Sequence, residues 1–202
     1  MSIAPPTDRR RRRTHMSVLN SAERLFALDG YRATTVEALA READVALSSI
    51  YANFPGGKAD VYAALACRTA DDHATAMRTA TAMPSPNAPL LNAFDAYVEF
   101  HRGRPLAFRL LALTDVDDQE TELIIQARKF IDSTLLALTD ELATEIDAPT
   151  EDAKLLVLLA WATINGVLSL RHRSSITQAT ADTLIELARA DSARRLEDLK
   201  NA

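Results

Sequence analysis

The stretch from Thr35 to Lys58 constrains the fold most, because a helical pattern is broken in it twice. Thr35 can cap a short helix that runs to about residue 43, and Asp44 then interrupts the pattern, since aspartate tolerates a left-handed backbone. A second short helix is predicted over residues 46–53, until Pro55-Gly56-Gly57 ends it. Two short helices joined by a tight turn are typical of a helix-turn-helix.

The second of these short helices carries small side chains on one face. A helix that enters the major groove of DNA, which is about 12 Å wide, must be slim on its outer face. Val45 and Ile50 are expected to pack inward on the preceding helices, and Phe54 to close the small core. The slim residues are Ala46, Ser48, Ser49 and Ala52.

The rest of the chain is predicted to be helical, which makes the fold class all-α with about nine helices. Only five of the 202 residues are glycine, and the alternation that a strand needs is nearly absent. A first helix is expected from about His15 until Gly30 stops it. Further helices are expected at about 58–82, 90–102, 106–114, 120–146, 150–172 and 179–200, with a linker at 83–89.

A series of motifs follows in fixed order over residues 15–65. They are Ala22 and Phe26, Gly30-Tyr31, Thr34-Thr35-Val36, Leu39-Ala40, Ala43-Asp44-Val45, Ile50-Tyr51, Phe54 and Lys58. In this order and spacing they resemble the DNA-binding domain of the TetR (tetracycline-repressor-like) family. The resemblance implies an N-terminal three-helix helix-turn-helix head and a C-terminal helical body that binds a ligand and dimerises. This sequence departs from the family pattern in having Asp44 for a glycine, Ser48-Ser49 for Gly-Thr and Asn53 for a histidine.

The resemblance also implies which residues meet DNA. Thr35 would cap its helix and face a phosphate, while Ser49, Tyr51 and Asn53 would bond the DNA backbone. Lys58 would place its charge near a phosphate at the start of the next helix, where the helix dipole also favours an anion. The predicted DNA-binding residues are Arg11, Arg12, Arg13, Thr35, Leu47, Ser48, Ser49, Tyr51, Asn53 and Lys58.

Sequence specificity is expected from two features. The groove-facing helix has no arginine, lysine or glutamine for a bidentate base contact, so Leu47 is hypothesised to contact a thymine methyl group. Residues 1–14 are predicted to be a disordered basic arm, whose Arg9–Arg13 block is either a solvated tail or reaches along or into the minor groove. Residues 1–66 hold nine Lys/Arg and seven Asp/Glu, whereas the remainder holds 14 and 21, so the positive charge is concentrated in the head.

Residues 66–202 are expected to form a helical effector-binding and dimerisation body. The predicted helix at 150–172 is apolar almost all round between Leu155 and Leu170, so it must be buried on several sides. Proteins similar to this one pair their last two helices into a four-helix bundle, which implies a homodimer; the alternative is a buried core helix in a monomer. The predicted interface residues are Leu168, Leu184, Ala188 and Leu196.

The resemblance implies an effector pocket in this body. Few charges lie on the apolar faces concerned, so a small, largely apolar ligand is expected, with Arg109 or His101 as the candidate to hold one acid group. Plain core packing is the alternative role for each candidate. The candidate lining residues are Phe94, Tyr97, Phe100, His101, Phe108, Leu111, Trp161 and Asn165.

These features predict a transcriptional regulator, acting as a repressor, that binds a palindromic operator as a dimer and is released by its effector. The alternatives are an activator of the same fold, or a helical dimeric interaction protein whose head no longer binds DNA. An enzyme is not expected, because no sequence context pairs the scattered histidines with Cys67 or a serine nucleophile. The acidic run at 115–122 lacks the glycine and ligand spacing of a calcium loop, so neither a metal nor a cofactor is predicted.

A cytoplasmic location is expected from the cysteine content and the apolar segments. A single cysteine fits a reducing compartment, and no apolar segment follows the basic N-terminus. The longest apolar run, Leu155–Ala162, is far shorter than the roughly 18 residues that suggest a membrane span.

Overall fold

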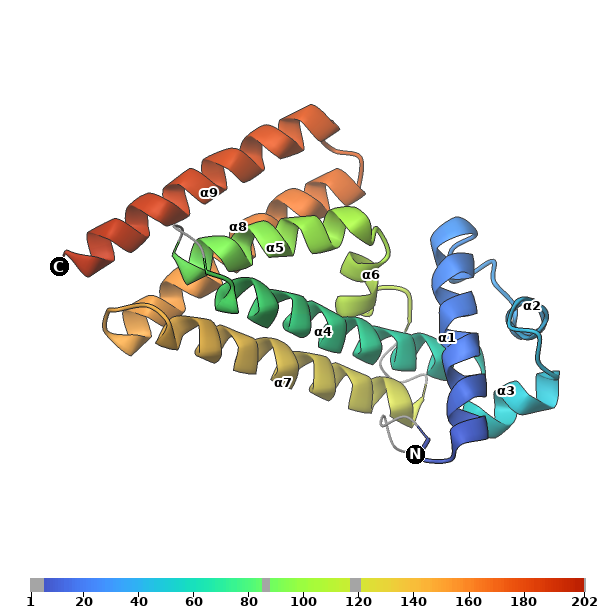
Figure 1. The fold of residues 1–202 in the computed structure, drawn as a ribbon. Coiled ribbons are helices and arrows are strands. Elements are labelled where there is room, and N and C mark those ends of the chain that lie inside the picture. The colour runs from blue at the N-terminus through green and yellow to red at the C-terminus, as the bar shows by residue number, and fades with distance from the viewer. Residues whose placement is uncertain (1–5, 85–87, 117–120, 202) are drawn as a thin grey trace. The chain divides into compact units, whose positions relative to one another are not determined.

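The computed structural model describes residues 6–84, 88–116 and 121–201 (Figure 1). Within these ranges the chain forms nine α helices and no strand, which confirms the predicted all-α class. The helices are α1 (Arg9–Leu28), α2 (Val36–Glu42), α3 (Leu47–Asn53), α4 (Lys58–Ala82), α5 (Pro89–Gly103), α6 (Ala107–Leu111), α7 (Glu122–Thr144), α8 (Thr150–His172) and α9 (Gln178–Lys200).

The helices divide into two compact units. The head unit comprises Met1–Asp72 and Arg104–Thr134, and the body unit comprises His73–Gly103 and Leu135–Ala202. Helices α4 and α7 therefore each contribute one part to the head unit and one part to the body unit. The predicted domains, 15–65 and 66–202, are continuous in the chain, whereas each of these contact-based units combines two segments.

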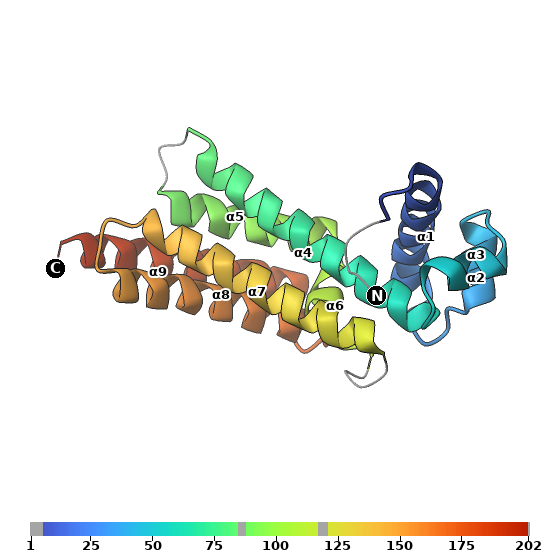
Figure 2. The same cartoon turned by 90° about the horizontal axis from the view of Figure 1, so that it is seen from below.

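The first four helices share one small core in the head unit. Helices α1, α2 and α3 contact one another pairwise (Figure 2). The core side chains Phe26, Leu39, Ile50 and Tyr62, one from each of the first four helices, are fully buried. Burying large apolar side chains of this kind contributes about 1.5–3 kcal/mol each, so two seven-residue helices are stabilised by packing and not by their own propensity.

Helix α1 begins earlier than the sequence predicted. The Arg9–Arg13 block, expected to be part of a disordered arm, forms the first turns of α1. Asp8 is the N-cap, and its Oδ1 accepts a hydrogen bond from the Arg11 backbone N–H at 2.8 Å. A capping carboxylate satisfies a backbone N–H that has no partner within the helix, and it offsets the positive end of the helix dipole.

The body unit is built on the antiparallel pair α8 and α9, which lie side by side (Figure 1). Helix α5 contacts both of them. Their shared core contains Val98 from α5, Leu156 and Ile164 from α8, and Ile185 from α9, all buried. This packing leaves a different side of α8 and α9 open to solvent.

Candidate nucleic-acid interface and candidate ligand cavity

The turn between α2 and α3 has the geometry that the sequence predicted. The Thr35 Oγ1 accepts a hydrogen bond from the Ala38 backbone N–H at 3.1 Å and so caps α2. Asp44 has a φ of 52°, in the left-handed region. The Ser17 hydroxyl of α1 donates to the Ala43 carbonyl at 3.0 Å, which ties the turn to the first helix.

Helix α3 presents a narrow, weakly polar face to solvent. Leu47 is 38% exposed and Tyr51 is 45% exposed, and Ser48 and Ala52 lie on the same open side. On the other side Ile50 is fully buried, as the sequence predicted. The open face therefore combines one aliphatic side chain, one phenol and small residues.

Phe54 anchors the end of α3 in the core of the head unit. It is fully buried, and its ring stacks on His15 of α1 with a centroid distance of 4.7 Å. Burial, together with the nearby charge of Arg68, lowers the pKa of His15 below its usual value of 6.5. A neutral imidazole at this position supports packing, and the predicted inward role of Phe54 is confirmed.

The structure differs from the prediction at Asn53. This side chain is 6% exposed, and its Nδ2 donates to the Ser49 carbonyl at 2.8 Å, one turn earlier in α3. Its Oδ1 is buried without a hydrogen-bond partner among the described residues. Asn53 thus faces the protein interior, and its amide is not presented to a DNA backbone.

Lys58 binds the protein's own backbone. Its Nζ donates to the carbonyl oxygens of Tyr31 at 2.7 Å and Thr34 at 2.8 Å, and a longer contact of 3.4 Å reaches that of Arg32. The same ammonium lies 4.3 Å from the centroid of the Tyr31 ring. The lysine therefore connects the α1–α2 loop to the start of α4, a structural role in place of the predicted free phosphate contact.

The Pro55-Gly56-Gly57 turn is organised by Asp60. The Gly56 backbone N–H donates to Asp60 Oδ2 at 2.8 Å, and the carboxylate is buried. Gly57 has a φ of 62°, where glycine is favoured. Because a protein carboxylate already occupies the N–H of this turn, it is a helix entry and not a phosphate-cradling loop.

The arginine segment, Arg9–Arg13, lies next to the end of α3. Its five side chains are exposed, and Arg11 Nη2 donates to the Ala52 carbonyl at 3.1 Å. That hydrogen bond joins the start of α1 to the last turn of α3. The positive charge is therefore held on a helix at the edge of the candidate interface.

Arg109, a candidate for holding a ligand's acid group, is already paired within the head unit. Its Nη2 contacts Asp115 Oδ1 at 2.5 Å, and Asp115 Oδ2 accepts from the Tyr62 hydroxyl at 2.9 Å. Burial, with Asp115 adding to it, raises the pKa of Tyr62 far above its usual value of 10. Asp115 thus has a structural role, and residues 117–120 of the acidic run lie outside the described part of the chain.

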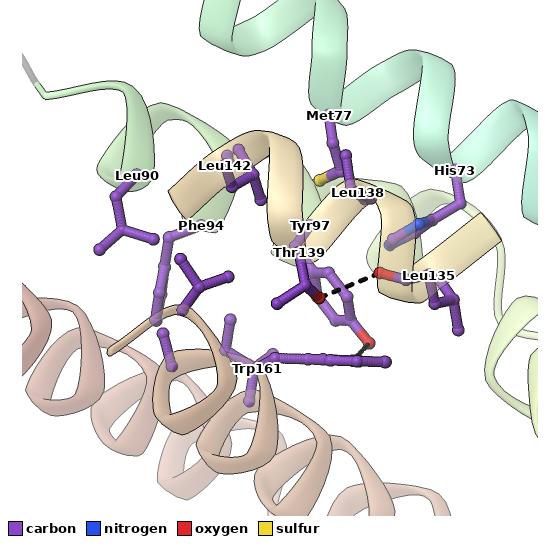
Figure 3. A pocket seen from close by; sticks show the side chains of 14 residues that line it. His73, Met77, Leu90, Phe94, Tyr97, Leu135, Leu138, Thr139, Leu142 and Trp161 are labelled. Carbon is purple, nitrogen blue, oxygen red and sulfur yellow. Dashed lines mark hydrogen bonds between the residues drawn. The ribbon is translucent and has the colours of Figure 1, made fainter. Parts of the chain in front are cut away.

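The body unit contains an apolar cavity of about 50 Å³ (Figure 3). Three predicted pocket residues, Phe94, Tyr97 and Trp161, line it, whereas Phe108 and Leu111 belong to the head unit and do not. The complete lining is His73, Met77, Leu90, Ala93, Phe94, Tyr97, Leu135, Leu138, Thr139, Leu142, Val157, Ala160, Trp161 and Ile164.

Two lining residues, Tyr97 and Trp161, belong to a hydrogen-bonded triad with Asn165. The Tyr97 hydroxyl donates to Asn165 Oδ1 at 2.8 Å and accepts from Trp161 Nε1 at 3.1 Å. Burial raises the pKa of Tyr97 to about 12, so the phenol stays protonated. Asn165, predicted to line the pocket, orients Tyr97 and is not itself part of the lining.

His73 is a cavity residue that the sequence interpretation missed. Its ring meets those of Tyr97 at 4.9 Å and Phe100 at 5.1 Å, both edge to face. Burial, with the nearby His101 adding to it, lowers the pKa of His73 to about 3. The sequence feature that could have identified it is its spacing in α4, since it lies four residues before Met77 and therefore on the same helical face.

His101 is not suited to hold an acid group. It is buried, and burial lowers its pKa to about 4, so the ring is neutral near pH 7. It packs against Tyr97 and Phe100 and is not among the cavity-lining residues. The structure thus gives neither candidate, Arg109 or His101, the predicted role.

Both α8 and α9 carry leucines that are exposed to solvent. Leu155 is 63% exposed, Leu159 is 44% exposed, and Leu187 is 61% exposed. Two of the predicted interface residues, Ala188 and Leu196, are buried inside the core of the body unit, and Leu168 and Leu184 are partly buried there. The exposed leucines are thus not among the predicted interface residues, and the interface stays a prediction.

Helix α8 is also long and apolar enough to cross a membrane by length and composition alone, with a mean hydropathy of 1.7. One third of that apolar window is buried inside the protein. A core helix of a soluble protein passes the same test, so this is weak evidence for a membrane span.

Groups suited to catalysis are few among the residues that the structure describes. No cluster of three or more His, Cys, Asp or Glu side chains that could hold a metal occurs there. Burial raises the pKa of the Cys67 thiol to about 12, which keeps it protonated and unreactive.

Two family models match different parts of the chain. The family model described as "Bacterial regulatory proteins, tetR family" matches residues 18–65, and "Tetracyclin repressor-like, C-terminal domain" matches residues 90–191. No curated protein matches the chain.

Solved structures share the fold over most of the chain. A putative TetR-family transcriptional regulator from Mesorhizobium loti is 14% identical with a TM-score of 0.73, covering 94% of this chain and 98% of that one. A protein of unknown function from Rhodococcus is 21% identical with a TM-score of 0.68, covering 90% and 94%. The fatty acid degradation regulator FadR from Bacillus halodurans is 19% identical with a TM-score of 0.61, covering 87% and 97%. At these identities the similarity shows the fold alone.

Proposed function

This chain belongs to the TetR family of DNA-binding transcriptional regulators, and from that premise we propose that it is a ligand-responsive repressor. Two copies bind a palindromic operator, and a small, largely apolar effector releases them by favouring a dimer that does not fit the operator. The observation that carries the DNA-binding part is the juxtaposition, within one compact unit, of the open face of α3 and the arginine segment.

The candidate interface is equipped mainly to bind the DNA backbone. The arginine segment supplies positive charge for phosphates, and the Tyr51 and Ser49 hydroxyls and the exposed Thr35 supply hydrogen-bonding groups. Leu47 is the largest exposed aliphatic side chain on α3, which supports its proposed contact with a thymine methyl group. With Asn53 buried, specificity rests on Leu47, on DNA shape and on the arginine segment.

The exposed face of α8 and α9 supports the proposed homodimer. Leu155, Leu159 and Leu187 form an apolar surface that a second copy can cover, and a two-fold pair places two α3 helices on two half-sites. A second copy accounts for the apolar character of α8 without a membrane. A cytoplasmic location follows from the same proposal, since the operator is chromosomal DNA.

The cavity in the body unit supports the proposed effector site. Its lining is almost entirely apolar, which suits a largely apolar molecule. A role in fatty acid degradation is stated for the Bacillus halodurans regulator alone, because 19% identity shows only a shared fold. The effector proposed for this chain rests on the chemistry of its own cavity.

One observation favours a second candidate function. Among the described residues of α3, no arginine, lysine or glutamine is present to read a base edge. A dimeric interaction protein with the same fold and a head that no longer binds DNA would show the same α3. An activator could have the same fold. The experiment must therefore also measure whether the protein raises or lowers transcription.

Selection of bound sequences from random duplex DNA tests the proposal. We expect a palindromic site, bound with an affinity that falls steeply as salt rises, because the arginine segment displaces counterions from phosphates. Replacing Arg9, Arg10, Arg12 and Arg13 with glutamine keeps a helix-forming residue at each position and should flatten the salt dependence by up to about one counterion per arginine.

The control for this experiment is the pair Arg194→Gln and Arg195→Gln, which removes two exposed arginines from α9 in the body unit. That variant should keep the wild-type salt dependence. Recovery of no enriched DNA sequence would contradict the DNA-binding proposal and favour the interaction protein. Reporter expression that falls when the regulator is deleted would identify an activator in place of a repressor.

A further inference from the structure

The cavity contains one polar side chain whose hydrogen-bonding groups are not used. His73 is 1% exposed, and neither of its ring nitrogens has a hydrogen-bond partner among the described residues. A buried polar group without a partner costs about 1–3 kcal/mol, and most such groups in folded proteins are satisfied. The His73 ring points from α4 toward the side chains that line the cavity (Figure 3).

The other polar side chains of the lining are already engaged. The Tyr97 hydroxyl both donates, to Asn165, and accepts, from the Trp161 ring N–H. The Thr139 hydroxyl donates to the Leu135 carbonyl at 3.0 Å, within α7 (Figure 3). A molecule that enters the cavity therefore meets apolar surface and one unused polar ring.

The charge state of His73 limits which polar group it accepts. Burial keeps its pKa near 3, so at neutral pH the imidazole carries one N–H donor and one nitrogen acceptor. A hydroxyl or carbonyl group matches these atoms without bringing charge into the cavity. A carboxylate would be buried among apolar side chains with one neutral partner, which is unfavourable by several kcal/mol.

The size of the cavity shows that binding must widen it. Its volume of about 50 Å³ is smaller than the roughly 150 Å³ that accommodates benzene in an apolar protein cavity. Met77 lies four residues after His73 in α4, and its flexible side chain is the kind that repacks around a ligand. Entry of a ligand thus changes the packing of the helices that line the cavity.

We propose that His73 is the polar recognition residue of this cavity, and that the effector is an uncharged, largely apolar molecule that carries a hydroxyl or carbonyl group. This inference rests on the proposed function, because it specifies the ligand class of the effector site. It goes beyond that function in naming the residue that reads the ligand and the chemistry that the residue selects.

The chain offers its own reporter for a test, because Trp161 is its one tryptophan and lines the cavity. The full-length protein is titrated with octan-1-ol, octan-2-one and octanoate while Trp161 fluorescence is followed. The wild type should bind the alcohol and the ketone more tightly than the carboxylate. His73→Phe keeps a planar ring but removes both nitrogens, and it should bind the alcohol and the ketone about tenfold more weakly.

Two further variants separate recognition from disturbed packing. His73→Gln restores one donor and one acceptor and should recover most of the affinity for the alcohol and the ketone. Met77→Leu changes the shape of the same wall without changing its polar atoms, and it should leave the preference among the three probes unaltered. Thermal unfolding of each variant establishes that it is folded.

Three results would overturn the inference: no binding of any probe by the wild type, tighter binding of octanoate than of the uncharged probes, or equal binding by wild type and His73→Phe. Operator binding is measured in parallel on the same proteins. If the probes do not bind as expected but the protein still binds its operator, the inference about His73 is wrong and the proposed regulator is still supported. If the protein binds no DNA, the proposed function is wrong. Binding of the probes is still measured in that case, because Trp161 fluorescence does not depend on DNA.

Discussion

At the residue scale, Gly56 in the turn before α4 has no room for a larger side chain. A Cβ atom placed on Gly56 would lie 2.5 Å from Asp60 Oδ1 and 2.8 Å from Thr121 Cγ2. Asp60 is buried and fixed by the Gly56 N–H, so it cannot swing away without losing that hydrogen bond. The glycine is therefore required by close packing.

We expect Gly56→Ala to lower the free energy of unfolding by about 1–3 kcal/mol, because the added methyl group overpacks this turn. Chemical denaturation followed by circular dichroism measures the change. Gly103→Ala is the matched control, since Gly103 ends α5 and nothing lies within 4 Å of an added Cβ. If both variants are as stable as the wild type, the turn is less tightly packed than described.

Individual side-chain roles were the hardest part of the site to predict from sequence. Thr35, Ile50 and Phe54 behave as predicted, because capping and an apolar inward face follow from local pattern. Asn53 and Lys58 do not, since the positions of the α1–α2 loop and the head core decide what each side chain meets. His73 was missed for a related reason: only the packed body unit shows that its nitrogens face a cavity.

At the scale of elements, the periodicity of apolar residues predicted the helices well. Eight of the nine expected helices start within about three residues of their observed start, as the apolar faces required. The exception is α1. Repulsion among the Arg9–Arg13 side chains predicted a disordered segment, but Asp8 caps a helix that begins there. A capped helix start packed against α3 overcomes that repulsion, which is a tertiary effect that composition does not show.

Helix α8 carries the prediction that belongs to this scale. Leu155→Glu places a charge on the exposed apolar face and should raise the dissociation constant of the proposed dimer by at least about a hundredfold, as expected for a residue buried in the interface. Leu136→Glu is the matched control, because Leu136 is 53% exposed on α7, away from the α8–α9 face. Sedimentation velocity over a concentration series measures both constants. A Leu155→Glu variant that dimerises as well as the control would place the interface elsewhere.

At the scale of the whole molecule, three buried histidines contribute to how global stability responds to acid. Burial lowers the pKa of His15, of His73 to about 3, and of His101 to about 4. As the pH falls below about 6.5, the unfolded chain takes up protons that the folded chain does not, so unfolding becomes more favourable. The stability due to the neutral rings is present above that pH and is lost as the pH falls toward their folded-state pKa values.

Each of these histidines adds up to about 1.4 kcal/mol per pH unit to the slope of unfolding free energy against pH. We therefore expect urea unfolding between pH 7.5 and 5 to show a slope that His73→Phe reduces by about one proton. Met77→Leu, a change in the same cavity wall that neither adds nor removes a titratable group, should leave the slope as it is. Equal slopes in the wild type and His73→Phe would mean that His73 is protonated in the folded protein.

The exposed leucines of α8 and α9 have a consequence for the cell that makes this protein. In the proposed homodimer this face is covered when two copies meet, so the DNA-binding species grows with the square of the copy number when copies are scarce. Doubling gene dosage then raises promoter occupancy up to fourfold at low abundance, by simple mass action on a pair. Cell-to-cell variation in the number of copies is thereby amplified, and for the proposed repressor the threshold for silencing a promoter depends on synthesis and dilution as well as on the proposed effector.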